Sequence, residues 1–184
     1  MRKYVGERIQ KMREAQELSV EQVARLTGIE AERLRAFERG DAVPSIGAVI
    51  QLSRVFGSKM EGLLHGGATV TESLTICRSG ESFSGEQGDT EQSYAYHSLT
   101  RPGTAGHVME PFLLTFDPKV PQGAAITHDG QEFVYVVEGA IELFYDGRNY
   151  RLAKGDSAYL DSSRPHTFHG VGEGPARMLA VVSS

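Results

Sequence analysis

Apolar residues recur three and four positions apart through the first third of the chain. Val5, Ile9 and Met12 show this spacing, and it continues with interruptions to residue 64. Three- and four-residue spacing places apolar side chains on one face of an amphipathic helix. The apolar spacing in residues 5–64 therefore predicts a group of packed helices.

Capping and turn residues divide this region into five short helices. Ser19 stands at a helix start with Gln22 at the capping-box position, and Gly28 follows the last residue that fits the period. A capping box satisfies two backbone N–H groups at the start of a helix, and glycine commonly ends one. The other boundaries are predicted at Arg39-Gly40, Pro44-Ser45, Gly57-Ser58 and His65-Gly66-Gly67.

The pattern changes to short strands after residue 92. Runs such as "YAYHSL", "PFLLTFDP", "RNYRLAKGDSAYLD" and "ARMLAVV" are separated by turn pairs that include Asp146-Gly147 and Gly155-Asp156. Many short strands with glycine turns are typical of an antiparallel β-sandwich or small barrel. The chain is therefore expected to have a two-domain α+β fold, with an all-α bundle followed by antiparallel β-structure.

The boundaries between these parts follow from composition. Residues 1–65 form the predicted helical domain, and residues 92–184 form the predicted β domain. Between them, residues 66–91 are rich in glycine, serine and glutamate and predict a linker. The segment "ESLTICRS" at 72–79 alternates, so it is expected to add an edge strand to the barrel.

Charge and composition indicate the kinds of partner and the cellular compartment to expect for the protein. The net charge is −5, but residues 1–65 carry +2 and the remaining residues carry −7, which favours two domains with different partners. No apolar run approaches the roughly 20 residues that span a bilayer. The single cysteine, Cys77, excludes an internal disulfide and fits a reducing cytoplasm. We expect a cytoplasmic protein without a membrane segment.

The helical half has the residue spacing of a known DNA-binding motif. The stretch "LSVEQVARLTGIEAERLRAFERGDAVPSIGAVIQLSRVFG" resembles the helix-turn-helix of the phage-repressor (Xre/Cro-like) family over residues 3–64. The matching positions are Ala24, Gly28, Leu34, Phe37, Glu38, Gly40, Pro44 and Ser45. The resemblance implies that the helix at about 30–39 enters the major groove of DNA.

Three arginines on that helix are the candidate DNA-binding residues: Arg33, Arg35 and Arg39. Guanidinium groups contact phosphate or the edge of guanine. Glu30 and Glu32 at the front of the same helix oppose this role, because phosphate repels them. DNA binding by a homodimer or tetramer is the expectation, and a helix-turn-helix kept only for packing or dimerisation is the alternative.

The β half carries parts of two metal-binding motifs. His128 precedes Glu132 by four positions and Gly139 follows seven later, while Gly155 precedes Pro165-His166. These spacings resemble the cupins over about residues 92–184, which implies a jelly-roll barrel. Ile126 stands where the family has its first histidine. The ligand set that remains is His128, Glu132 and His166, with the first two expected on one strand and one face.

Two neutral imidazoles and a carboxylate with open positions opposite form the ligand set of non-haem Fe(II) oxygenases, and they also suit Zn²⁺. We expect a divalent metal, Fe(II), Zn, Ni or Mn, at these residues. The alternative is a metal-free cavity lined by the same polar side chains.

A closer resemblance covers most of the chain. A repressor-type helix-turn-helix followed by this triad is similar to the hydroxypropylphosphonic acid epoxidase family, which also implies that Tyr94 and Tyr96 line the iron pocket with Ile126 nearby. The lysine, arginine and asparagine that grip the phosphonate in that family match positions on or near Glu17, Gly88 and Ala125 here. A doubly charged phosphonate needs such donors. This departure argues against that epoxidase activity.

The sequence therefore predicts a transcription regulator that binds DNA through its helix-turn-helix and a small-molecule effector in its cupin pocket. The alternative is a mononuclear non-haem iron oxygenase with an unknown substrate, in which the helical domain is structural. A third interpretation is a metal-free scaffold that dimerises through the barrel.

Overall fold

The computed structural model describes residues 2–58, 60–65, 74–79, 84–85, 94–100 and 108–183. The chain divides into two compact units. One contains the helices and the described residues up to Ile76, and the other contains the described residues from Cys77 to Thr100 and from Val108 onward.

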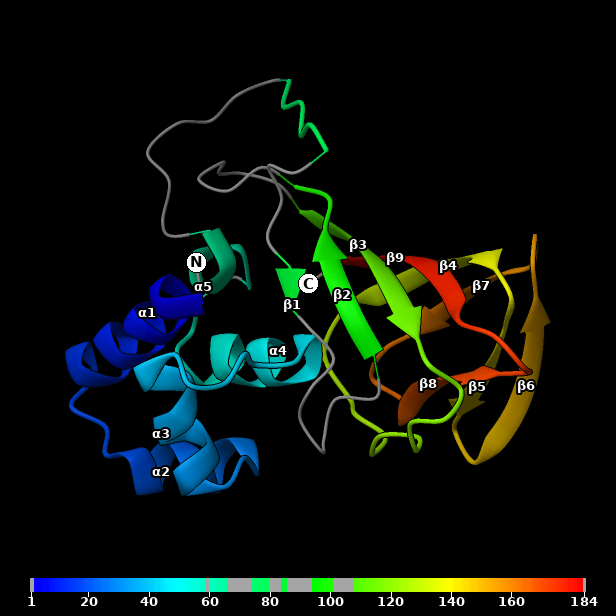
Figure 1. The fold of residues 1–184 in the computed structure, drawn as a ribbon. Helices are drawn as coiled ribbons and strands as arrows, with labels where there is room; N and C mark the ends of the chain where they lie inside the picture. The colour runs from blue at the N-terminus through cyan, green and yellow to red at the C-terminus, as the bar shows by residue number, and fades with distance from the viewer. Residues whose placement is uncertain are drawn as a thin grey trace. The chain divides into compact units, whose positions relative to one another are not determined.

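Five helices lie in the described part of the first unit, as the sequence predicts (Figure 1). They are α1 Arg2–Ala15, α2 Val20–Thr27, α3 Ala31–Arg39, α4 Ile46–Val55 and α5 Met60–His65. The described helices are too short or too polar to cross a membrane.

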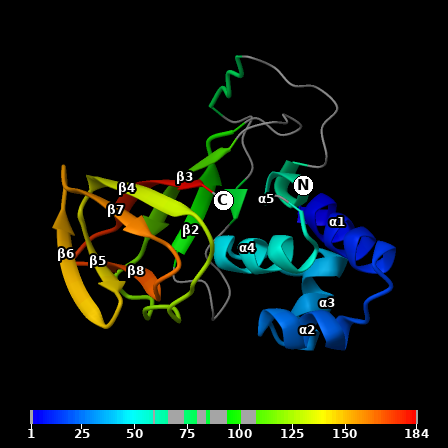
Figure 2. The same ribbon diagram turned by 180° about the vertical axis from the view of Figure 1, so that it is seen from behind.

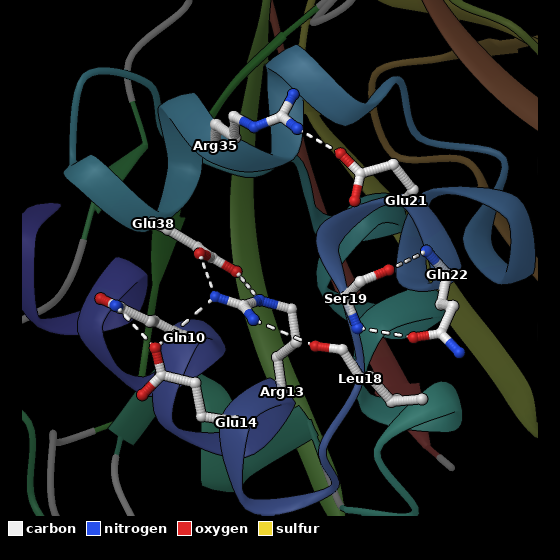
Figure 3. A network of polar contacts seen from close by, with 9 residues as sticks. All are labelled: Gln10, Arg13, Glu14, Leu18, Ser19, Glu21, Gln22, Arg35 and Glu38. Atoms are coloured by element: carbon white, nitrogen blue, oxygen red, sulfur yellow. Dashed lines mark hydrogen bonds and ion pairs between the residues drawn. The ribbon is translucent and has the colours of Figure 1, made fainter.

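The predicted capping box at the start of α2 is present. Ser19 Oγ accepts a hydrogen bond from the backbone N–H of Gln22 at 3.1 Å, and Gln22 Oε1 accepts one from the N–H of Ser19 at 2.7 Å (Figure 3). Gly28 follows α2 with a φ of 74°, and Gly40 follows α3 with a φ of 77°. Left-handed backbone favours glycine, so both helices end where the sequence places their last residue.

A partly buried ion pair connects α1 with α3. The Arg13 guanidinium donates from Nε to Glu38 Oε1 at 2.6 Å and from Nη2 to Glu38 Oε2 at 2.8 Å, and its Nη1 donates to the carbonyl of Leu18 at 3.0 Å (Figure 3). Two parallel bonds between guanidinium and carboxylate fix orientation as well as distance. The pair therefore helps to hold the start of α2 and the end of α3 in place.

The described residues of the second unit form two antiparallel sheets, which confirms the expected antiparallel β domain. The strands are β1 Ser84–Gly85, β2 Tyr94–Ser98, β3 Met109–Phe116, β4 Gln131–Glu138, β5 Ala140–Tyr145, β6 Arg148–Ala153, β7 Ser157–Asp161, β8 His166–Val171 and β9 Ala176–Ser183. One sheet has the order β1-β2-β3-β9-β4-β7 (Figure 1), and the other has the order β6-β5-β8 (Figure 2 shows it from behind).

The edge strand expected at 72–79 is not formed by the part of that segment that the structure describes. Residues 74–79 carry no regular secondary structure, and Ser84–Gly85 pairs with β2 instead. Alternation alone does not make a strand unless one face is covered, and Leu74 and Ile76 are both exposed. Most of the predicted linker at 66–91 lies outside the described residues, and the domain boundaries stay a prediction.

Inward-facing residues of the larger sheet are mostly large and apolar. They include Phe112, Phe116, Val134 and Met178, which are fully buried. One transverse row differs, because Glu110 on β3 and Glu132 on β4 both pair with Val182 on β9 and are buried with it. Buried carboxylates require compensation by hydrogen bonds or cations. Glu132 in this row is part of the candidate metal centre.

Candidate metal centre and nucleic-acid interface

The three predicted metal ligands lie together inside the barrel. Their exposed fractions are 1% for His128, 5% for Glu132 and 1% for His166. One ligand atom from each lies within 4.8 Å of the others. Residues that are distant in the sequence thus converge on one point in the fold.

The elements that carry these residues differ in one respect from the expectation. Glu132 lies on β4 and His166 begins β8, but His128 lies in the loop before β4 rather than on the strand. The backbone N–H of His128 donates to the carbonyl of Ser162 at 2.8 Å. The chain bends at Asp129-Gly130, where Gly130 has a φ of 91°, between His128 and β4. The expectation that one strand carries both residues was therefore wrong, although they do share one site.

A single carboxylate oxygen contacts both imidazoles. Glu132 Oε1 lies 2.6 Å from His128 Nε2 and 3.4 Å from His166 Nε2. The two rings stand edge to face, with centroids 5.2 Å apart. The three atoms form a small cluster of possible electron-pair donors.

Backbone carbonyls determine which ring nitrogen of each histidine points at Glu132. His128 Nδ1 lies 2.9 Å from the carbonyl oxygen of Asp129, and His166 Nδ1 lies 2.8 Å from that of Arg164. A carbonyl oxygen only accepts hydrogen bonds, so Nδ1 carries the proton in both rings. In a neutral ring, Nε2 then presents a lone pair to the centre. This arrangement is typical of metal-bound histidines.

The electrostatics of the cluster favour a cation. Burial alone raises the pKa of Glu132, but its close contacts with the imidazoles of His128 and His166 outweigh it and lower the pKa to about 2. Burial lowers the pKa of His166, and the adjacent Glu132 carboxylate outweighs this effect, so the net shift is upward. A buried carboxylate beside two lone pairs needs positive charge between them. A proton on an imidazole or a divalent metal provides it.

The spacing of the donor atoms fits a metal ion. Two ligands at about 2.0–2.2 Å from one ion lie roughly 2.8–3.6 Å apart in octahedral or tetrahedral geometry. The distance between His166 and Glu132 is within this range, and the 2.6 Å distance between His128 and Glu132 needs only a small widening. The cluster is therefore consistent with a divalent metal.

Ile126 lies directly opposite His166. Its N–H donates to the His166 carbonyl at 2.9 Å, and its carbonyl accepts from the His166 N–H at 3.0 Å. Opposite residues in an antiparallel pair direct their side chains to the same face. The residue that replaces the missing histidine is thus next to the triad.

Tyr94 and Tyr96 share the face of β2 that faces the barrel interior, as the alternation predicts. The Tyr96 ring packs edge-on against Phe112 at 6.0 Å, and the Tyr94 ring lies 5.5 Å from Phe116. Burial raises the pKa of Tyr96, so its hydroxyl keeps its proton. Their role in a ligand pocket stays a prediction.

Sequence reasoning missed a second buried polar group in the barrel. Ser98 Oγ and Thr100 Oγ1 are 2.9 Å apart, and Thr100 Oγ1 donates to Glu110 Oε2 at 3.4 Å. Glu110 is buried in the same transverse row as Glu132. The signal that could have found it is a glutamate at an inward position of the apolar run "VMEPFLLTF", because such positions otherwise hold apolar residues.

The three candidate DNA-binding arginines lie on α3 but differ in their surroundings. Arg33 places its guanidinium 5.3 Å from the centre of the Phe37 ring. Arg35 forms ion pairs with Glu21 on α2 and, at 3.4 Å, with Glu32 (Figure 3 shows the contact with Glu21). The helix therefore does not present the three arginines equally.

Arg39 extends the ion pairs along the helix. Its Nε lies 2.7 Å from Asp41 Oδ2, and its Nη2 lies 3.4 Å from Glu32 Oε1. Arg35 and Arg39 are thus joined through Glu32, whose side chain is 73% exposed. We call this set of two arginines and three carboxylates, with Glu21 and Asp41 at its ends, the α3 ion-pair network. The carboxylates outnumber the guanidinium groups by one, so the network is acidic overall.

Comparison with known proteins agrees with the two units. Residues 5–63 match the helix-turn-helix domain family, and residues 112–182 match the cupin domain family. The chain carries a helix-turn-helix domain followed by a cupin domain. It is 24% identical over 177 residues to the HTH-type transcriptional regulator PuuR of Escherichia coli (strain K12), covering 96% of this chain and 92% of that protein.

Two solved structures show the same fold along the whole chain. An HTH_3 family transcriptional regulator from Vibrio cholerae has a TM-score of 0.71 and 20% identity, and the match covers 100% of this chain and 96% of that one. Hydroxypropylphosphonic acid epoxidase from S. wedmorenis has a TM-score of 0.51 and 22% identity, with 98% and 97% covered. Both resemblances drawn from the sequence are confirmed at the level of fold.

Proposed function

We propose that this protein is a transcription regulator that binds DNA through α3 and senses a small molecule in its cupin barrel. The pairing of a helix-turn-helix domain with a cupin domain supports this function. The match to a transcriptional regulator over nearly the whole length of both chains supports it further. We expect the protein to be cytoplasmic. We also expect a homodimer or tetramer, because a helix-turn-helix reads paired half-sites as a symmetric oligomer.

A divalent metal, Fe(II), Zn, Ni or Mn, would be held by His128, Glu132 and His166. The observation that carries this part is the convergence of two Nε2 atoms on one buried carboxylate oxygen. Carbonyl groups hold each Nδ1 proton away from the centre. With three protein ligands, positions remain for water or an effector, and the metal would supply a Lewis acid to which an anionic or carbonyl oxygen binds.

Metal analysis of the full chain tests this proposal. Protein purified without chelator is loaded in turn with each of the four ions, desalted and measured by mass spectrometry of its metal content. The matched control for the ligand variant His128→Ala is His169→Ala, because His169 lies on β8 but faces the opposite side from His166. The proposal requires one ion per chain in the wild type and in His169→Ala. Protein that retains none of the four ions contradicts it.

DNA binding is tested separately by selection of bound sequences from random or genomic DNA at low salt. An enriched, roughly palindromic sequence supports the regulator. Absence of enrichment in both metal-loaded and metal-free protein contradicts it, whatever the metal analysis gives.

An iron-dependent oxygenase is the second candidate, and the ligand set favours it. Two histidines and one carboxylate leave a face of Fe(II) open to other ligands. Its substrate would not be a phosphonate, because Glu17 and Ala125 lack the donors that a phosphonate needs, while Gly88 lies outside the described residues. Oxygen consumption by Fe(II)-loaded protein that continues for many turnovers when ascorbate supplies the electrons, and that is absent in His128→Ala, would support this candidate.

A further inference from the structure

A groove of about 550 Å³ lies on the outer face of the larger sheet. It is bounded by the segment Cys77–Ser79 and by His97 on β2, Leu113 on β3 and Arg177 on β9. These strand residues alternate with the buried inward-facing ones. The groove is therefore on the side of the sheet opposite the metal ligands. Its volume is that of a small-molecule site, which is roughly 300–1,000 Å³.

The lining of this groove is basic although its domain is acidic. Residues 66–184 contain 8 Lys/Arg and 15 Asp/Glu. Two of those eight cations, Arg78 and Arg177, face the groove together with His97, and its described lining includes no carboxylate. A concave surface lined by positive charge attracts negatively charged ligands.

Arg177 keeps hydrogen-bonding capacity for a ligand. Its Nη1 lies 3.8 Å from Glu138 Oε2, and the two side chains are 43% and 61% exposed. An exposed pair at this distance is weak, and a guanidinium has five N–H donors. A carboxylate in the groove can therefore bond to Arg177 without displacing a buried partner.

Part of the groove lining is apolar. Leu99 and Leu113 line it beside the two arginines. Leu99 is 39% exposed, so its side chain has apolar surface that a ligand can cover. Burial of apolar area and a charge-assisted hydrogen bond together favour a ligand with a hydrocarbon part and one anionic end.

We propose that this groove binds a small organic carboxylate, with its anionic end at Arg177 and Arg78 and its apolar part against Leu99 and Leu113. The site is separate from the metal centre. It does not depend on the proposed DNA-binding function.

Hexanoate is the probe for this site. The full chain is treated with chelator first, so that the metal centre cannot take up the carboxylate. Methyl groups of leucine are labelled with carbon-13, and the signals of Leu99 and Leu113 are assigned by their loss in Leu99→Met and Leu113→Met. Hexylamine and hexanol, which keep the hydrocarbon but lose the negative charge, are titrated in parallel.

The proposal predicts saturable shifts at both leucine methyls with hexanoate and much weaker ones with hexylamine and hexanol. Arg177→Gln and Arg78→Gln should each weaken hexanoate binding about tenfold or more, the loss of one charge-assisted hydrogen bond. The matched control is Arg148→Gln on β6, which removes the same charge from the other sheet and should leave the affinity unchanged.

Equal binding of hexanol and hexanoate would overturn the proposal, since the site would then recognise only hydrocarbon. Unchanged hexanoate affinity in both Arg177→Gln and Arg78→Gln would overturn it as well. Circular dichroism spectra and melting temperatures of each variant show whether it is folded. Both arginines have solvent-exposed side chains, so their loss is not expected to unfold the domain.

Discussion

His128 Nε2 lies 2.6 Å from Glu132 Oε1 inside the barrel, and a backbone carbonyl fixes the opposite nitrogen of that ring. The ring is thus held with its lone pair toward a carboxylate that is itself an acceptor. Two acceptors at this distance repel each other unless a proton or a metal ion lies between them. The behaviour expected of the β unit follows from this relationship.

Removal of one ligand should remove the metal. His128→Ala leaves one histidine and one carboxylate, and we expect it to lose most of the bound ion, because two protein ligands rarely hold a labile metal. Metal content after desalting measures the effect, with His169→Ala as the control. Retention of a full equivalent by His128→Ala would place the metal elsewhere in the chain.

Addition of a ligand should tighten binding. Ile126 pairs with His166 through two backbone hydrogen bonds, so Ile126→His would place a fourth donor on the same face. We expect the dissociation constant for Zn²⁺ to fall at least about tenfold as the set becomes four-coordinate. Titration against a chelator of known affinity measures it. Ile126→Leu is the control, and an equal change in both variants would show that packing rather than ligation is responsible.

Metal affinity should depend on pH. The pKa of His166 is raised by Glu132, so a proton competes with the metal from somewhat above the ordinary histidine pKa of about 6.5 downward. We expect affinity to fall as pH decreases through this raised value. Isothermal titration at a series of pH values checks this, and an affinity independent of pH between about 5.5 and 8 would contradict it.

The stability of the metal-free protein should decrease as pH rises, whereas its metal affinity should increase. The folded state holds the His166 proton more tightly than the unfolded chain does, so this stabilisation is complete below about pH 6.5 and is lost as pH rises through the raised pKa. We expect the melting temperature of metal-free protein to decrease over this interval. Bound metal should remove the decrease, and thermal denaturation with and without metal measures the difference.

The α3 ion-pair network should restrain DNA binding. Glu32 bridges Arg35 and Arg39 and is exposed, so phosphate competes with it for both arginines. We expect Glu32→Gln to strengthen binding to DNA of arbitrary sequence roughly two- to fivefold, the free energy of an exposed ion pair. Fluorescence anisotropy at fixed salt measures this. Glu17→Gln, an exposed change of equal charge in the same unit, should have a smaller effect.

Substitution of the arginines themselves should alter the salt dependence. Arg35→Ala and Arg39→Ala should each weaken DNA binding and reduce the slope of log affinity against log salt by about 0.9 for each phosphate that the variant no longer binds. Arg33→Ala should instead lower the melting temperature, because the Arg33 guanidinium packs over Phe37. Slopes that are identical in wild type and in both of the first two variants would exclude phosphate binding by these residues.

Local signals in the sequence were sufficient to predict features in which a residue type has one structural role. Ser19 with Gln22 predicted a capping box, and the positive φ of Gly28 and Gly40 ends two helices as expected. The ligand triad was also found, because histidines and glutamate at cupin spacing are uncommon. These features depend on short stretches of chain or on a known pattern.

Other features depend on contacts between distant residues and could not be predicted. The position of His128 is set by a hydrogen bond to Ser162, which is remote in sequence, and not by strand alternation. Similarly, the pairing of Arg35 with Glu21 requires α2 and α3 to be packed together. The segment at 74–79 alternates but has no regular structure, since strand formation depends on a partner that the sequence does not name.

The place of β9 in the larger sheet has a consequence for the timing of assembly. This strand lies between β3 and β4, which therefore do not pair with each other, and it is made after both. During synthesis on the ribosome, β4 has no neighbour on that side until β9 has left the exit tunnel. Glu132 is carried by β4 and pairs with Val182 of β9. The proposed metal ligands therefore become enclosed on this side only after β9 has been made, and a ribosome stalled before this strand would display a barrel without its central strand.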